Sequence, residues 1–230
     1  MSVESSPETN PTGFTLFAVL ARSRSQATPD VSDESVAELQ SIESAPLPTG
    51  VVVRGLYDVS GMRGSAEVMI WLHGDRPEDL QRALRSLRRS QMLGTLDCEW
   101  SAMGVHREAE FNKRHVPGFL RGEGARAWLC LYPFDRSYEW YLLDESERSA
   151  LLAEHGMKAA PYTDIVANTV STFALSDYEW LLPMESDNLV SLVDMMRALR
   201  ATGARRHVRG EVPFYTGRRV SAAELAEVLS

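Results

Sequence analysis

The sequence predicts an α+β fold assembled from two similar halves. Two strands, an amphipathic helix and a further strand follow one another in the first half, and the same order returns in the second. In both halves the helix carries apolar residues at the spacing i, i+3, i+4, i+7, which places them on one face. A chain of 230 residues is long enough for one large domain or two small ones. We therefore expect a duplicated unit whose two antiparallel sheets come together within one chain, with helices packed on one face of each sheet.

The strands of the first half are indicated by runs of β-branched and aromatic residues. FTLFAVLAR predicts a strand over residues 14–22, and a helix is predicted over residues 33–44. Residues 51–59 and 66–74 are separated by the glycine-rich sequence GMRG. This pattern is typical of two adjacent antiparallel strands joined by a hairpin.

The amphipathic helix of the first half is expected to open at Asp75 and Pro77. Proline is favoured in the first turn, where its missing N–H would have no partner in any case. The apolar stripe of this helix consists of Leu80, Ala83, Leu84 and Leu87.

The second half begins with predicted strands over residues 124–134 and 137–143. Asp144 and Glu147 then have the spacing of a capping box at the start of a helix. Glycine is favoured just past the last turn, so we expect this helix to end at Gly156.

The chain then repeats the pattern of its first half. Residues 166–175 and 177–184 are predicted to be a strand pair, and a helix is expected to start at residues 186–187. The inward face of that helix is assigned to Leu189, Leu192, Val193 and Met196. Ser221 and Glu224 predict a capped, short helix at the C-terminus.

Composition restricts the class of partner. The formal net charge is −8 and hydrophobic residues make up 44% of the chain, as in a soluble globular protein. A general nucleic-acid binder would carry a basic stripe, which this sequence lacks. We expect the partner to be a small molecule or another copy of the chain.

Cysteine use and hydropathy favour the cytoplasm. Cys98 and Cys130 form no C-x-x-C motif, so they predict neither a disulfide framework nor a zinc or iron–sulfur site. Residues 1–13 are polar and acidic, which indicates a disordered tail without the basic and apolar regions of a signal peptide. No apolar run approaches the roughly 18 residues of a membrane span.

The strongest local signal for a site is the stretch LYPFDRSYEWYLL, residues 131–143. It contains three tyrosines, a tryptophan and Arg136. A half-buried strand with cross-strand aromatic packing explains the pattern, and so does an aromatic and cationic wall of a cofactor pocket. The Walker, G-x-G-x-x-G, G-x-S-x-G and H-E-x-x-H motifs are absent from the sequence.

Two histidines, His155 and His115, each have a structural explanation, and His155 has a functional one as well. His155 lies near the predicted end of a helix, where it can interact with the last carbonyl groups, or it can present an imidazole to a metal from an apolar face. His115 lies in the basic segment FNKRHVPGF and is typical of an exposed loop residue.

Four segments together resemble a known family. GLYDVSGMRGSAEVMIWLHG, LCLYPFDRSYEWYLL, AEHGMKAAPY and DYEWLLPM occur here in the order and spacing of the actinobacterial coproheme decarboxylases, within the chlorite dismutase superfamily. The likeness runs from about Phe14 to the C-terminus. It implies two ferredoxin-like repeats, residues 14–110 and 111–230, whose sheets form a dimeric α+β barrel with the porphyrin site in the second repeat. It also implies a homopentamer.

The resemblance assigns roles to individual residues. His155 matches the axial ligand of the porphyrin iron, and Tyr132 matches the catalytic tyrosine. His115 matches the distal base that acts on hydrogen peroxide. The propionate side of the pocket matches Arg136, Trp140 and Arg205.

The activity implied by the resemblance is the hydrogen peroxide-dependent decarboxylation of Fe-coproporphyrin III, or coproheme. Two propionates become vinyl groups through a tyrosyl radical, and haem b forms by way of a three-propionate intermediate. Coproheme is then both substrate and redox cofactor, with no separate metal. A transient contact with a coproporphyrin ferrochelatase is a further implication. Arginine suits this substrate because its planar guanidinium group donates two parallel hydrogen bonds to a single carboxylate.

Two alternatives remain open. A chlorite dismutase or haem peroxidase would keep its haem, and a non-catalytic porphyrin carrier would need His155 without Tyr132 and His115. Ala204 is taken to stand where chlorite dismutases keep a distal arginine, which disfavours chlorite chemistry. A shift of the alignment by one residue would place Arg205 or Arg206 there instead.

Overall fold

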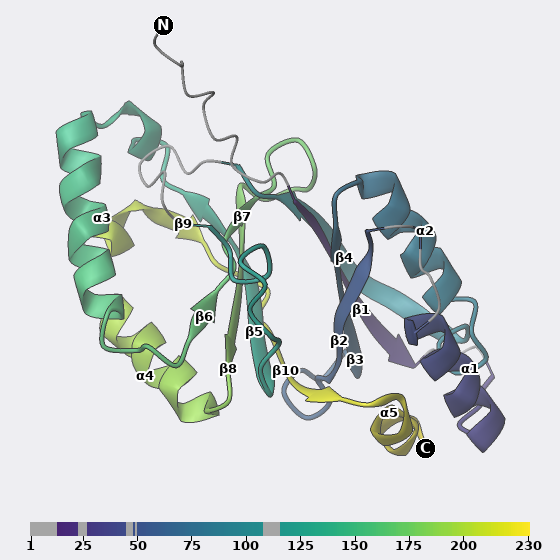
Figure 1. The fold of residues 1–230 in the computed structure, drawn as a ribbon. Helices are drawn as coiled ribbons and strands as arrows, with labels where there is room; N and C mark the ends of the chain where they lie inside the picture. The colour runs from purple at the N-terminus through teal and green to yellow at the C-terminus, as the bar shows by residue number, and fades with distance from the viewer. Residues whose placement is uncertain (1–12, 23–26, 45–47, 49, 108–115) are drawn as a thin grey trace, which may run out of the picture.

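Eight antiparallel strands close into a barrel at the centre of the molecule (Figure 1). The computed structural model describes residues 13–22, 27–44, 48, 50–107 and 116–230. The barrel strands are β1 (Phe14–Arg22), β2 (Val52–Asp58), β3 (Val68–Gly74), β4 (Leu96–Val105), β5 (Trp128–Arg136), β7 (Val170–Ser171), β8 (Trp180–Ser186) and β10 (Tyr215–Val220). Around the ring the order is β1, β3, β2, β10, β5, β8, β7, β4 and back to β1. Two short strands extend it, β6 (Val166–Ala167) on β8 and β9 (Val208–Gly210) on β5.

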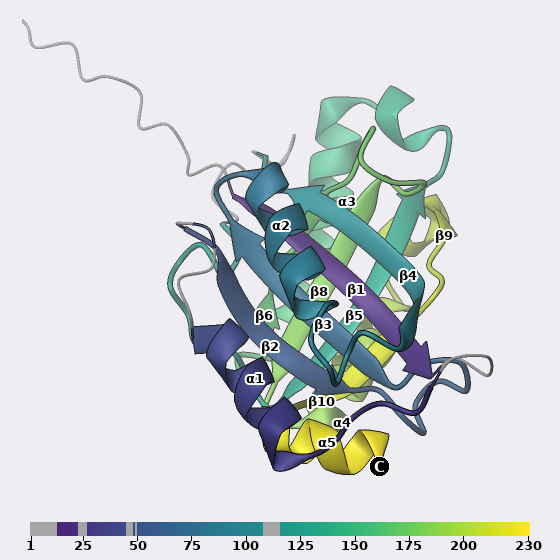
Figure 2. The same ribbon diagram turned by 90° about the vertical axis from the view of Figure 1, so that its right-hand side faces the viewer.

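Helices cover the outside of the barrel on two opposite sides (Figure 1). The helical elements are α1 (Asp33–Ser44), α2 (Pro77–Leu87), α3 (Glu145–Ala159), α4 (Leu189–Leu199), α5 (Ala222–Leu229) and the 3-10 helices η1 (Trp140–Leu142) and η2 (Gly203–His207). Figure 2 shows α1, α2 and α5 on the side of the first-half strands. The helices α3 and α4 pack together on the side of β5 and β8.

The two halves have the same strand order. The first half runs β4-β1-β3-β2 across its sheet, and the second runs β10-β5-β8-β7. In each case the first and third strands of the half lie in the middle, as in a ferredoxin-like unit. The pairs β2–β10 and β4–β7 join the two sheets. This confirms the predicted α+β fold with two paired repeats.

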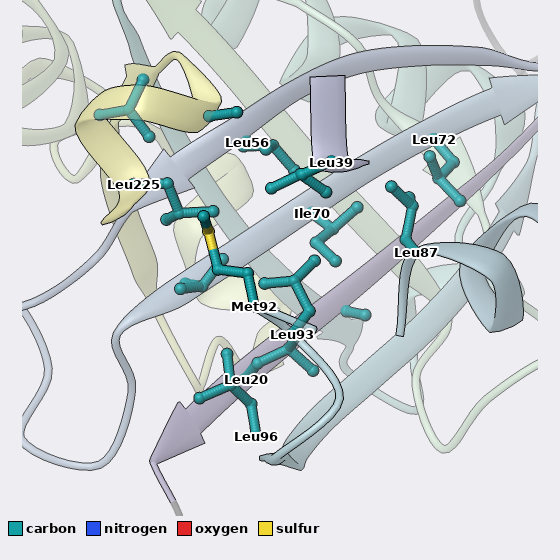
Figure 3. Packing of buried hydrophobic residues seen from close by; sticks show 14 of the residues in the cluster. Leu20, Leu39, Leu56, Ile70, Leu72, Leu87, Met92, Leu93, Leu96 and Leu225 are labelled. Carbon is teal, nitrogen blue, oxygen red and sulfur yellow. The ribbon is translucent and has the colours of Figure 1, made fainter. Parts of the chain in front are cut away.

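The strand β1 has side chains in two separate cores, because successive residues of a strand point to opposite faces. Leu16 and Leu20 pack under α1, α2 and α5, in the cluster drawn in Figure 3. Phe17 and Val19 point into the barrel, beside Trp71. A third, smaller cluster lies between β5, β8 and α4.

Several elements form where the sequence predicts them. The bounds of β1 and α1 are as predicted, and β2 and β3 are an antiparallel hairpin. Pro77 is the first residue of α2, although Arg76 rather than Asp75 stands at the N-cap. Ser221 and Glu224 form the predicted capping box of α5.

The predicted strand over residues 137–143 is wrong. Tyr138 and Leu142 are 76% and 86% exposed, whereas Trp140 between them is 2% exposed. A strand would place these three residues on one face, so this burial pattern excludes it. The backbone instead makes the 3-10 helix η1, in which the N–H of Trp140 donates to the carbonyl of Ser137 over 3.1 Å.

The helix α3 starts as predicted, with Asp144 at the N-cap, but the predicted capping box and the predicted end at Gly156 are wrong. The side chain of Asp144 makes no capping hydrogen bond, and the helix continues through Gly156 to Ala159. Glycine lowers helix propensity without forbidding helical backbone, so flanking residues can carry a helix across it.

Two further details of the second half differ from prediction. The strand expected over residues 166–175 is reduced to β6 and β7, and Asn168 between them directs its side chain to Glu185 and to the N–H of Phe119. In α4 the N-cap is Asn188, and Val193 is 51% exposed while Met195 is buried. Leu189, Leu192 and Met196 pack against the cluster as predicted, and only Val193 of the predicted set faces outward.

Candidate functional site

Tyr132 lies at the centre of a candidate site on the outer face of the second-half sheet. It belongs to β5 and its side chain packs with Met184, Leu192 and Met195 between the sheet and α4. The phenol oxygen Oη donates a hydrogen bond to Sδ of Met196 over 3.5 Å. Burial raises the pKa of Tyr132, so its phenol keeps its proton at neutral pH.

Arg136 and Trp140 form a stacked pair at the end of β5. The Cζ atom of Arg136 lies 4.1 Å from the centroid of the Trp140 ring and 5.0 Å from that of Phe134. Arg136 is half-buried, and burial lowers its pKa. Among the residues that the structure describes, no carboxylate forms a salt bridge with it, which leaves its guanidinium available to an anion.

His155 projects from α3 next to this pair. Its Nδ1 atom is buried and has no hydrogen-bond partner in the described part of the chain. Burial lowers the pKa of His155 and the nearby charge of Arg136 lowers it further, while Glu154 opposes both. The imidazole is therefore held neutral, which is the form that binds a metal. Within residues 13–22, 27–44, 48, 50–107 and 116–230 no group of three or more His, Cys, Asp or Glu could hold a metal ion.

A pocket of about 330 Å³ lies beside Tyr132. Its lining includes Arg200, Arg205, Arg209, Glu211 and Phe214. The ring of Phe214 stacks on that of Tyr132 with centroids 4.4 Å apart. The pocket thus combines three cations with an aromatic wall, Phe214, that packs on the ring of Tyr132.

Arg205 lines this pocket and is paired with a carboxylate there. Its Nη1 atom lies 2.6 Å from Oε2 of Glu211, and Arg200 binds the same carboxylate over 2.8 Å. Both guanidinium groups are about two-fifths exposed. An incoming carboxylate would therefore compete with Glu211 for them.

The sequence analysis missed Arg200 and Arg209. Both lie in the stretch MRALRATGARRHVRG, whose density of arginine is a signal that could have revealed them. They are distributed over the end of α4 and β9, so only the tertiary structure brings them to one pocket.

A carboxylate that the sequence analysis did not single out ties the walls of the site together. Oε2 of Glu179 accepts hydrogen bonds from the backbone N–H of Arg136 over 2.7 Å and from the phenol of Tyr141 over 3.0 Å. Its Oε1 lies 3.5 Å from the guanidinium of Arg209. Trp180 donates its indole N–H to the Tyr141 oxygen over 3.1 Å. The DYEW segment therefore anchors β5, η1 and β9.

The sequence analysis also named His115 and Ala204. His115 lies outside the described residues. Ala204 is buried in η2, next to Gly203, whose N–H donates to Glu154 and whose Cα faces the side chain of Leu151. Leu151 and His155 are one helical turn apart, so η2 packs on the histidine's own side of α3. The assignment of Ala204 to the place where chlorite dismutases keep a distal arginine stays a prediction.

Comparison with known proteins identifies the family. The model of the family described as chlorite dismutase matches residues 32–220. The chain belongs to the chlorite dismutase family. Within it, the chain is 51% identical over 213 residues to the coproheme decarboxylase of Mycolicibacterium smegmatis, covering 92% of this chain and 90% of that protein. The coproheme decarboxylase of Staphylococcus carnosus is 26% identical over 143 residues, covering 54% of this chain and 56% of that protein.

Solved structures of the family share the fold. The chlorite dismutase from Candidatus Nitrospira defluvii in complex with imidazole superposes with a TM-score of 0.80. It is 21% identical, with 94% of each chain covered. In the part of the present chain that the structure describes, no helix has the length and apolar character needed to cross a bilayer.

Proposed function

We propose that this chain is a coproheme decarboxylase that consumes hydrogen peroxide and converts two propionates of Fe-coproporphyrin III into vinyl groups. Each propionic acid group and one molecule of hydrogen peroxide give one vinyl group, one carbon dioxide and two molecules of water. A three-propionate species is the intermediate and haem b is the product. The relative at 51% identity over 92% of the chain supports this substrate.

One observation carries the proposal at the level of the site. A buried, protonated phenol stacks on Phe214, which lines the cationic pocket, and the guanidinium of Arg136, without a salt bridge among the described residues, acts on the imidazole of His155, whose Nδ1 is unsatisfied. Coproheme has a metal for the imidazole and four carboxylates for the cations. The residues present therefore fit this substrate.

The proposed roles follow from the contacts. His155 binds the iron through neutral imidazole, and Arg136, Trp140 and Arg205 hold propionates. Tyr132 gives up a proton and an electron together, because its raised pKa makes loss of the proton alone unfavourable. The resulting tyrosyl radical would take a hydrogen atom from the β-carbon of the propionate, which is the carbon attached to the ring. Carbon dioxide would then leave as one further electron passes to the peroxide-derived oxidant, giving the vinyl group. His115 is the base that takes the first proton from hydrogen peroxide.

The proposal also includes the location, oligomeric state and protein partner of the enzyme. We propose that the chain is a cytoplasmic homopentamer and that it receives coproheme by transient contact with a coproporphyrin ferrochelatase. Neither nucleic acid nor a membrane has a role.

Mass spectrometry of the porphyrin tests the reaction directly. Coproheme is added to the purified protein, hydrogen peroxide is titrated in, and the porphyrin mass is followed. We expect stepwise loss of two carboxyl groups. Unchanged or merely bleached coproheme would instead favour a haem-retaining oxidoreductase or a carrier, and chlorite would then be tested as substrate.

Two variants test the roles of individual residues in the same assay. Tyr132→Phe should bind coproheme and form no vinyl group, whereas Tyr162→Phe, which changes another tyrosine packed against the same cluster, should remain active. His155→Ala should lose the absorption bands of imidazole-bound iron. An active Tyr132→Phe protein would exclude the radical role.

A further inference from the structure

We propose that Met196 is a peroxide-sensitive modification site, whose oxidation to the sulfoxide switches off the phenol of Tyr132. This inference rests on the proposed function, because it takes hydrogen peroxide as the oxidant. Its starting point is the 3.5 Å hydrogen bond from Oη of Tyr132 to Sδ of Met196. Thioether sulfur is a weak acceptor, so this contact places an oxidisable atom against the phenol without holding it strongly.

Met196 is more exposed than the other methionines of its cluster and lies close in sequence to a residue that lines the pocket. It is half-buried on α4, whereas Met184 and Met195 in the same cluster are 3% and 6% exposed. Arg200 lies one helical turn further along the same helix and lines the cationic pocket. Because of this difference in exposure, we expect peroxide to reach Met196 more readily than the two buried methionines.

The chemistry is an oxygen-atom transfer. The sulfur lone pair of Met196 attacks one oxygen of hydrogen peroxide, the O–O bond breaks, and the products are methionine sulfoxide and water. Sulfur loses two electrons and the peroxide gains them, with the two protons of the peroxide retained in the water. The modification is reversible by methionine sulfoxide reductases, so it can act as a switch.

The consequence for Tyr132 follows from the change of acceptor. A sulfoxide oxygen is a far stronger hydrogen-bond acceptor than a thioether, and the sulfur that would carry it is already the acceptor of the phenol. The O–H group of Tyr132 is then held in a hydrogen bond to the Met196 sulfoxide and is not free to turn toward the substrate. Since Tyr132 must release its proton together with an electron, we expect the oxidised protein to stop forming vinyl groups while it still binds coproheme.

Peptide mass spectrometry during turnover tests this proposal. The coproheme-loaded protein is treated with stepwise peroxide, and oxygen addition is mapped at Met196, at Met195 and at two exposed methionines, Met62 (50% exposed) and Met157 (70% exposed). In parallel, zinc coproporphyrin replaces coproheme as a redox-inert control. We expect Met196 sulfoxide to rise in step with the loss of vinyl formation, and methionine sulfoxide reductase to restore activity.

A variant that lacks the oxidisable sulfur provides a second test of the role of Met196. Leucine has a volume close to that of methionine, so Met196→Leu should fold. Relative to its own initial rate, this variant should lose activity several-fold more slowly under peroxide than the parent protein. Met157→Leu, the matched control on α3, should lose activity at the parent rate.

The outcomes separate the two proposals. If freshly purified protein forms no vinyl group at all, the proposed function is wrong. If fresh protein is active but loses activity while Met196 remains a thioether, or if Met196 becomes a sulfoxide without loss of activity, the role of Met196 is overturned. Equal inactivation of Met196→Leu and the parent protein would have the same meaning.

Discussion

The protonation of His155 is controlled by two effects that act in the same direction, burial and a nearby positive charge. Burial lowers the pKa of His155, and the positive charge of Arg136 adds to this effect. The neutral imidazole therefore persists at a lower pH than in an exposed histidine. Because the unfolded chain binds more protons in this range, His155 also lowers the stability of the fold as pH falls below 6.5 toward the folded-state pKa.

We expect His155 in the porphyrin-free protein to titrate with a midpoint below 6.5, the ordinary value for histidine. Arg136→Gln removes one of the two causes and should raise the midpoint. NMR titration of the imidazole C–H signals, assigned with a His155→Gln variant, measures both values. Arg209→Gln is the control, since Arg209 is not among the groups acting on His155. A midpoint at or above 6.5 would contradict the structure.

At the scale of elements, α3 is notable for continuing through Gly156. Nothing lies within 4 Å of the position that a Cβ atom would occupy on this residue, and its backbone is helical. Alanine there would reduce the entropy of the unfolded chain and improve helix propensity without a clash.

Gly156→Ala should therefore raise the free energy of unfolding of the porphyrin-free protein by about 0.5–1 kcal/mol. Urea denaturation followed by circular dichroism measures this. Gly203→Ala is the matched control, because its Cβ would lie 2.7 Å from a side-chain atom of Leu151, and it should destabilise the protein. A loss of stability in Gly156→Ala would mean that the helix ends before this residue.

The N-termini of α3 and α5 differ in a way that sequence spacing does not reveal. Ser221 accepts a hydrogen bond from the N–H of Glu224 over 3.3 Å, whereas Asp144 makes no such bond. Ser221→Ala should lower the free energy of unfolding by about 1 kcal/mol. Asp144→Ala should have a smaller effect in the same denaturation experiment, and an equal effect would show that Asp144 caps α3 in solution.

At the scale of the whole molecule, one buried ion pair joins the two halves. Arg54 of β2 binds Oε2 of Glu185 of β8 over 2.6 Å, and both side chains are almost fully buried, at 5% and 0% exposure. Asn168 adds a bond to the same carboxylate, and Arg54 also donates to the carbonyl of Glu123. Burial raises the pKa of Glu185, and Arg54 opposes the shift.

Removing one member of such a pair leaves the other charge buried without compensation. We expect Glu185→Gln to lower the free energy of unfolding by about 3 kcal/mol or more. Asp194→Asn breaks an exposed pair with Arg197, at 51% and 80% exposure, and should change it by less than about 1 kcal/mol. The double variant Arg54→Met, Glu185→Leu should recover most of the loss. Comparable effects of the two single variants in urea would show that the buried pair does not stabilise the barrel.

Local pattern was sufficient for most of the first half and for the C-terminal helix. The strand β1, the helix α1, the hairpin β2–β3 and the capped helix α5 each depend on side chains close together in the chain. Periodicity and turn residues report such short-range preferences directly. Tyr132 and Arg136 were predicted as parts of one site because they lie in one aromatic and cationic stretch, residues 131–143, which also carries the family resemblance.

Contacts between distant residues decided the rest. Arg54 and Glu185 are 131 positions apart, and Tyr132 and Met196 are 64 apart, so no spacing in the sequence predicts either contact. The stretch around Trp140 has the composition of a strand, yet packing of its indole against Arg136 and exposure of its neighbours favour η1. The sequence alone indicates which side chains are apolar enough to be buried. Closure of the barrel determines which of these side chains are in contact, because the partners of a buried residue come from distant parts of the chain.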